Sequence, residues 1–198
     1  MTSALIIIDL QNDFCPNGHL AVAGGDEIVP LINAIANDFP HVILTQDWHP
    51  QGHSSFASQH VGHAPFTQID MSYGPQTLWP DHCIIGSKGA AFHPGLDVPN
   101  AELIIRKGFR TSIDSYSAFF ENDHKTATGL GGYLKERGIK KLTFVGLAFD
   151  YCVRYSAEDA KSLGFETEVI EHATRAIDMG GTAAATKASF ANRSIILR

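Results

Sequence analysis

Three residues that could carry out a hydrolysis lie at the ends of short apolar runs. Asp9 directly follows the apolar run Ala4–Ile8, Lys107 ends a second run, and Cys152 follows a third run at the start of a helical pattern. Unpaired N–H groups at a helix start favour a thiolate, and a nearby lysine lowers a thiol pKa further. We therefore predict Cys152 as a nucleophile with a lowered pKa, against the alternative of a buried, inert cysteine.

Histidines are crowded in one part of the chain. There are 10 His, and seven of them lie between residues 41 and 93. Alternate residues of an extended segment face the same side, so Asp47 and His49 can point together. Pro50 and Gly52 allow a turn that brings His53 back toward them. One carboxylate and two imidazoles suit a divalent ion such as Zn, Fe(II) or Mn.

The complete ligand set stays open at this point. His82 is a further candidate, and His60 and His63 compete with it on spacing alone. Scattered surface histidines are the alternative to any metal site. Cys15 and Cys83 lack the placement of a nucleophile, and we expect them to be structural.

The elements that must position these residues alternate between apolar runs and helical patterns. We expect strands at Ala4–Ile8, Val42–Thr45, Glu102–Ile105, Leu142–Gly146, Glu166–Ile170 and Ser194–Leu197. We expect helices at Asp26–Asn37, Leu130–Arg137, Cys152–Leu163 and Gly181–Ala191. This alternation predicts an α/β fold: a doubly wound, six-stranded, mostly parallel sheet with helices on both faces. Ligands bind beyond the carboxyl ends of such strands.

We expect one domain over residues 1–198. The segment at about 47–96 breaks the alternation, since it is rich in Gly, Pro, His and Ser and has little periodicity. So long an irregular stretch in a compact domain is usually functional, so we expect a metal-site insertion.

Composition excludes several other classes of function. The chain has 198 residues, 15 Lys and Arg, and 21 Asp and Glu, which gives a formal net charge of -6. That balance argues against nucleic acid or an anionic membrane as a partner. Three widely spaced cysteines are typical of free thiols in a reducing compartment. No basic segment precedes the first apolar run, so we expect no signal peptide and a soluble, cytoplasmic protein.

Several longer motifs are specific to one family. They are Asp9–Phe14, Gln46–Pro50, Trp79–Cys83, Lys107-Gly108, Asp114–Phe120, Gly146–Ala148 and Asp150–Val153. In this order they resemble nicotinamidase/pyrazinamidase, a branch of the isochorismatase-like cysteine hydrolases, and they cover nearly the whole chain. Phe149 departs from the pattern, because the family often has a small polar residue there.

The resemblance implies a role for each matching residue. The catalytic residues would be Asp9, Lys107 and Cys152, and the metal ligands Asp47, His49, His53 and His82. The N–H groups of Ala148 and Cys152 would form an oxyanion hole next to a cis peptide bond between Leu147 and Ala148. Phe14, Trp79, Tyr116 and Leu147 would bind the substrate.

The resemblance also implies an activity. The enzyme would hydrolyse nicotinamide, and also pyrazinamide, in NAD salvage through a cysteine thioester. It would use one divalent metal ion per subunit (Zn, Fe or Mn) and no organic cofactor, and it could form a homo-oligomer. The alternatives are another isochorismatase-like amidohydrolase, such as an isochorismatase or a carbamoyl amidohydrolase, a metallohydrolase using metal-bound water, or a non-catalytic metal-binding protein on the same fold.

Overall fold

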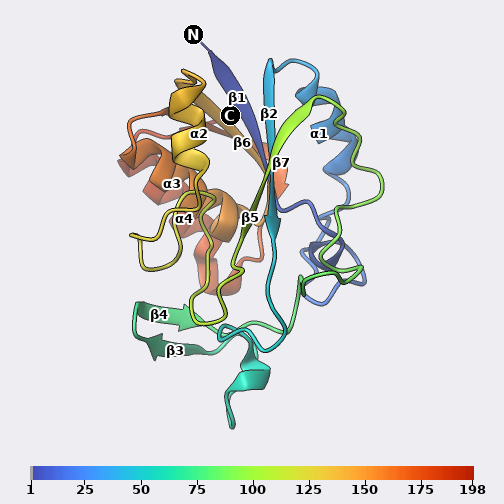
Figure 1. Ribbon diagram of the computed structural model, residues 1–198, viewed down its shortest axis with the longest axis vertical. Coiled ribbons are helices and arrows are strands. Elements are labelled where there is room, and N and C mark those ends of the chain that lie inside the picture. Colours follow the sequence, from blue (N-terminus) through green and yellow to red (C-terminus); the bar gives the residue numbers. More distant parts are fainter. Residues whose placement is uncertain (1) are drawn as a thin grey trace.

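A single six-stranded sheet organises the computed structural model, which describes residues 2–198. Its strands are β1 (Ser3–Ile8), β2 (His41–Asp47), β5 (Ala101–Lys107), β6 (Lys141–Leu147), β7 (Glu166–Arg175) and β8 (Ile196–Leu197). They lie in the order β5-β2-β1-β6-β7-β8, and every neighbouring pair is parallel. All carboxyl ends therefore meet at one edge, which points downward in Figure 1.

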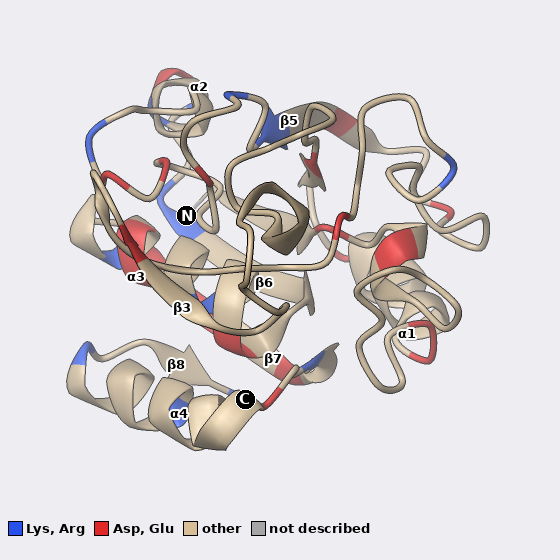
Figure 2. Ribbon diagram, turned by 90° about the horizontal axis from the view of Figure 1, so that it is seen from below, with Lys and Arg blue, Asp and Glu red and all other residues tan. Residues whose placement is uncertain are grey.

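Helices cover both faces of the sheet. α1 (Val29–Ala36) packs on one face, and α2 (Leu130–Glu136), α3 (Arg154–Ser162) and α4 (Thr182–Asn192) pack on the other (Figures 1 and 2). Strand β1 lies between these layers, with Leu5 and Ile7 in the core on the α1 side and Ile6 and Ile8 in the opposite core. Side chains alternate along a strand, so an all-apolar strand fills both cores.

The predicted α/β fold is confirmed, with three local differences. Strand β7 continues five residues beyond the expected Ile170, through an irregularity in its pairing with β6. Helix α1 begins at Val29 rather than after Asp26. A π-helical turn, Phe149–Val153, precedes α3, so Cys152 lies inside a helical turn and not at the start of an α-helix.

The segment between β2 and β5 has more structure than its composition indicates. It holds a short 3-10 helix (Ala57–Gln59) and an antiparallel hairpin of β3 (Gln68–Met71) and β4 (Gly74–Thr77). The hairpin lies below the carboxyl ends of the large sheet (Figure 1). Among residues 2–198, no helix is long and apolar enough to cross a membrane.

Candidate active site

The parallel sheet brings the acid, the lysine and the thiol together. Asp9 follows β1, Lys107 is the last residue of β5, and Cys152 lies beyond β6. The Lys107 Nζ is 2.8 Å from Asp9 Oδ2 and 3.4 Å from Cys152 Sγ. Asp9 and Lys107 are fully buried and Cys152 is 7% exposed, so this ammonium is held between a carboxylate and a thiol away from bulk water.

Burial sets the protonation state of this cluster. It raises the pKa of Cys152 well above its usual value, and the nearby Lys107 only partly opposes that rise. Burial also raises the pKa of Asp9, again against the attraction of Lys107. The lowered thiol pKa expected from the sequence is therefore wrong, because loss of hydration outweighs the lysine charge. Burial thus favours the thiol form of Cys152, so this candidate nucleophile would need a base.

Thr45 holds the candidate base in place, and sequence reasoning missed it. Its hydroxyl donates a hydrogen bond to Asp9 Oδ1 at 2.6 Å and accepts one from the Asp9 N–H at 3.1 Å. Asp9 has a φ of 45°, which an L-residue adopts only when its surroundings hold it there. Thr45 lies on the neighbouring strand β2, and its position within an apolar run gave no signal of this contact.

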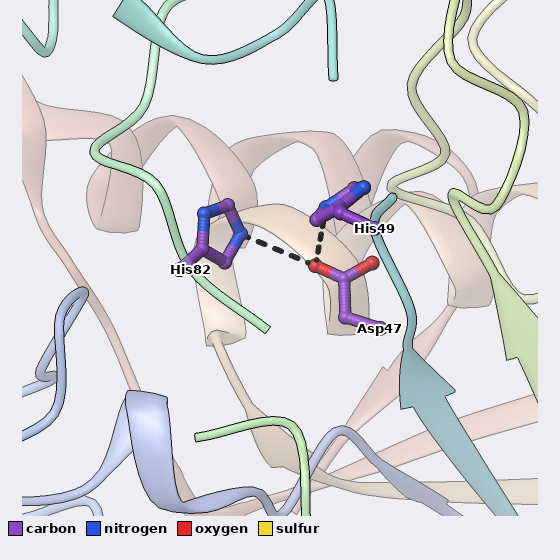
Figure 3. Close-up of side chains that lie close together, drawn as sticks. All are labelled: Asp47, His49 and His82. Carbon is purple, nitrogen blue, oxygen red and sulfur yellow. Dashed lines mark hydrogen bonds and ion pairs between the residues drawn. The ribbon is translucent and has the colours of Figure 1, made fainter. Parts of the chain in front are cut away.

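Three of the predicted metal ligands surround one point. The Nε2 of His49 is 3.1 Å from Asp47 Oδ2, and the Nε2 of His82 is 3.3 Å from the same oxygen (Figure 3). All three side chains are buried. Their ligand atoms lie within 4.8 Å of one another, close enough for a single ion.

The hydrogen bonds of the two imidazoles fit a metal ion. The Nδ1 of His49 donates to the carbonyl of Gly108, and the Nδ1 of His82 donates to that of Pro80, both at 2.8 Å. Each Nε2 therefore faces the Asp47 carboxylate, and its lone pair would be available to a cation bound between the three side chains. Backbone carbonyls that take the second N–H are typical partners of metal-bound histidines.

The Asp47 carboxylate also favours the protonated form of His49. Burial lowers the pKa of His49, but the charge and hydrogen bond of Asp47 outweigh it and raise that pKa to about 9. The other Asp47 oxygen, Oδ1, is 3.0 Å from Lys107 Nζ. Lys107 thus contacts both the Asp9–Cys152 pair and the group of potential metal ligands.

His53 lies beside these ligands but does not face the same point. Its ring is 4.4 Å from that of His49, centroid to centroid. Its Nδ1 is paired with Ser55, and its Nε2 is 2.9 Å from the carbonyl of Arg110. It belongs to a second group of potential ligand atoms, formed with His49 and Asp114. His60 hydrogen-bonds the carbonyl of Ser54 and joins neither group.

A narrow cavity opens onto the Cys152 thiol. Phe14, Trp79 and Tyr116 line it, as the resemblance implied, together with Ala148. Leu147 is not among the residues that line it. The Leu147 side chain is fully buried in the core on the α1 side. The sequence also missed four residues of the cavity wall, which come from separate segments: Leu20, Asp114, Tyr151 and Ile177.

Comparison with known proteins identifies the family. The isochorismatase domain family matches residues 3–196. This chain belongs to the isochorismatase family. Within it, a nicotinamidase from Acinetobacter baylyi is 55% identical over 179 residues, which cover 90% of this chain and 84% of the relative.

Solved structures of similar proteins support this family assignment. A nicotinamidase/pyrazinamidase from Acinetobacter baumanii has a TM-score of 0.98 and 52% identity, and covers 99% of this chain and 95% of its own. The pyrazinamidase of Pyrococcus horikoshii, solved in complex with zinc, has a TM-score of 0.82 and 31% identity. That alignment covers 100% of this chain and 99% of the other.

Two local features of the isochorismatase-family pattern are visible beside the nucleophile. The peptide bond between Leu147 and Ala148 is cis, as the resemblance implied. Phe149, the one departure from the pattern, points away from the cavity into the core under α4, where its ring lies 5.8 Å from that of Phe190. The substitution therefore changes packing behind the turn and adds nothing to the cavity wall.

Proposed function

We propose that this chain is a metal-dependent nicotinamidase that hydrolyses nicotinamide to nicotinate and ammonia through a thioester on Cys152. The observation that carries the proposal is the position of Lys107. Its ammonium touches the candidate base Asp9, the candidate nucleophile Cys152 and the candidate metal ligand Asp47. The nicotinamidase and pyrazinamidase relatives support this substrate class, and pyrazinamide is an expected second substrate.

In the first half of the reaction, Asp9 accepts the Sγ proton of Cys152. The thiolate attacks the carboxamide carbon of nicotinamide, and Lys107 stabilises the negative charge while it is on sulfur. The N–H groups of Ala148 and Cys152 are the proposed donors to the oxyanion that forms. Asp9 then returns the proton to the leaving nitrogen, so ammonia departs and the C–N bond is replaced by a C–S bond.

The second half regenerates the thiol. Asp9, again a carboxylate, accepts a proton from a water molecule that attacks the thioester carbon. The C–S bond breaks, nicotinate leaves, and the proton returns to the sulfur of Cys152. The raised pKa of Asp9 suits this role, because a base works best when its pKa lies near the working pH.

Asp47, His49 and His82 would hold the divalent ion. When bound, it would supply a Lewis acid that anchors the ring nitrogen of the substrate. Zn, Fe(II) and Mn all suit this ligand set, and a homologous pyrazinamidase binds zinc. His53, whose ring contacts His49, would support that ligand instead of binding the ion. A role in NAD salvage, a cytoplasmic location and a homo-oligomeric state remain predictions.

Ammonia release from nicotinamide by the purified, metal-loaded protein tests the proposal. Cys152→Ala should abolish release and keep the fold, while the matched variant Cys15→Ala, which removes a buried thiol outside the cavity, should retain it. Mass spectrometry of protein quenched during turnover should detect the acyl adduct on Cys152. Activity near wild type in Cys152→Ala would instead indicate a metallohydrolase that uses metal-bound water.

A further inference from the structure

A buried glutamine lies in the β3–β4 hairpin, whose other strand residues are exposed or half-buried. Gln76 is fully buried, whereas its neighbour Pro75 on the same strand is exposed and Thr77 is half-buried. A buried amide must find hydrogen-bond partners, because burial without them costs about 1–3 kcal/mol. The hairpin is therefore attached to the rest of the molecule through the contacts of this side chain.

Both ends of the Gln76 amide are occupied. Its Oε1 accepts hydrogen bonds from the Tyr73 hydroxyl at 3.1 Å and from Asn122 Nδ2 at 3.0 Å. Its Nε2 lies 2.8 Å from the Tyr116 hydroxyl oxygen and 3.0 Å from Asp114 Oδ2. The Nε2 is also 2.7 Å from the carbonyl of Thr77, so its two N–H groups are shared among three acceptors, and contacts at both ends fix the orientation of the amide.

Asn122 ties the same network to the backbone. Its side-chain oxygen accepts from the N–H of Tyr116 at 3.0 Å, and its own N–H donates to the carbonyl of Asp114 at 2.8 Å. Gln76 and Asn122 therefore hold the Asp114–Tyr116 segment from both its side chains and its main chain.

The Tyr116 hydroxyl is where the network reaches the cavity. Its oxygen accepts from Gln76 Nε2 and from Trp79 Nε1, the latter at 3.2 Å. The Tyr116 and Trp79 rings meet edge to face, with centroids 6.2 Å apart, and both line the cavity above Cys152. Gln76 itself does not line the cavity. Gln76 therefore contacts two residues that line the cavity, Tyr116 and Asp114, without lining it itself.

We propose that Gln76 is a positioning residue for substrate affinity: it fixes the Tyr116 and Trp79 rings that enclose the pyridine ring. This inference rests on the proposed function. It implies that the β3–β4 hairpin holds the Tyr116 and Trp79 side of the cavity in place. Gln76 makes no hydrogen bond to Cys152, Asp9 or Lys107, and the segment that it holds reaches Lys107 only through the Ser115 carbonyl, which accepts from Lys107 Nζ at 3.0 Å. We therefore expect the main effect of Gln76 to be on binding.

The test compares Gln76→Met, which keeps the length of the side chain and removes the amide, with Gln68→Met on the exposed face of the same hairpin. We expect Gln76→Met to raise the KM for nicotinamide about tenfold, the equivalent of one lost hydrogen bond. Its kcat per titrated Cys152 should stay within about twofold of wild type, and so should the rate of Cys152 alkylation. Gln68→Met should change none of these values.

A merely structural role would lower the fraction of active protein and the Tm without changing KM. An unchanged KM in Gln76→Met would therefore overturn the proposal, as would an equal fall in kcat and alkylation rate. If Gln76→Met does not fold, Tyr116→Phe tests the same contact with Gln76 intact, and an unchanged KM there would also overturn it. Wild-type protein that releases no ammonia would refute the proposed function first, which separates the two failures.

Discussion

Removing the Thr45 hydroxyl tests whether Asp9 is the base. Thr45→Val keeps the shape of the side chain and deletes the group that donates to Asp9 Oδ1 at 2.6 Å. The sheet offers a matched control on strand β6. There Thr143 donates to Glu168 Oε1 at 2.7 Å, and it is as fully buried as Thr45.

Both substitutions should destabilise the fold by similar amounts. Each removes a hydrogen bond to a buried carboxylate, which contributes about 1.5–3 kcal/mol when the acceptor is charged. Thr45→Val also leaves the Asp9 N–H without its acceptor, which adds about 1 kcal/mol. Urea unfolding should therefore give losses of about 2–4 kcal/mol for Thr45→Val and slightly less for Thr143→Val.

Activity should separate the two variants. The Thr45 hydrogen bond stabilises the carboxylate form and so lowers the pKa of Asp9, against the larger effect of burial, which raises it. Without the hydroxyl the pKa rises further, and at a given pH less of Asp9 is available as a base. The acid limb of the kcat/KM profile should therefore move to higher pH in Thr45→Val.

Thr143→Val should keep the wild-type pH profile, because neither Thr143 nor Glu168 lines the cavity. Profiles of kcat/KM for ammonia release between pH 4 and 9 make the comparison. An unmoved acid limb in Thr45→Val, with the expected loss of stability, would show that Asp9 does not set the rate as a base. An equal shift of the acid limb in both variants would also refute the proposed effect of the Thr45 hydrogen bond on the pKa of Asp9.

Four further measurements test the remaining roles. Asp9→Asn removes the proton acceptor at constant size, so kcat in the ammonia assay should fall by about 10² or more; a fall below about threefold would contradict the mechanism. Lys107→Ala should shift iodoacetamide labelling of Cys152 to higher pH and lower stability by about 3–5 kcal/mol in urea, because it leaves buried carboxylates unpaired. Chelation should abolish nicotinamide turnover and preserve iodoacetamide labelling of Cys152, and adding Zn, Fe(II) or Mn should restore turnover. Full turnover without metal would refute the proposal that the ion anchors the ring nitrogen of the substrate. Metal affinity by calorimetry should rise with pH up to about 9, since the proton on His49 must leave.

The positions of the principal site residues followed from the sequence because strand ends determine them. In a parallel sheet, every residue that ends a strand reaches the same edge, so Asp9, Asp47 and Lys107 could be placed together without any knowledge of loops. The register places Asp47 directly opposite Lys107 on neighbouring strands. Local apolar runs are sufficient for this kind of prediction, and they located the six strands of the large sheet but not the β3–β4 hairpin.

Residues that act through long-range contacts could not be found in the same way. Gln76 lies in a segment with no apolar periodicity, and its burial depends on Tyr116 and Asn122, which are 40 and 46 positions away. Spacing alone also could not separate His53 from His82. The sequence allows both to reach Asp47, and only the fold shows that the His53 nitrogens already have partners, the Ser55 hydroxyl among them.

The reason why the expected lowering of the Cys152 pKa is wrong also bears on the mechanism. A helix start and a lysine both favour a thiolate, but each effect is modest, whereas full burial of a thiol removes its hydration and outweighs them. Full burial also raises the pKa of Asp9, so the acid and the thiol both hold protons more strongly than they would in water. A proton can then move between two groups of raised pKa beside the fixed charge of Lys107. Proton transfer from the Cys152 thiol to Asp9 is therefore the expected way to activate the nucleophile.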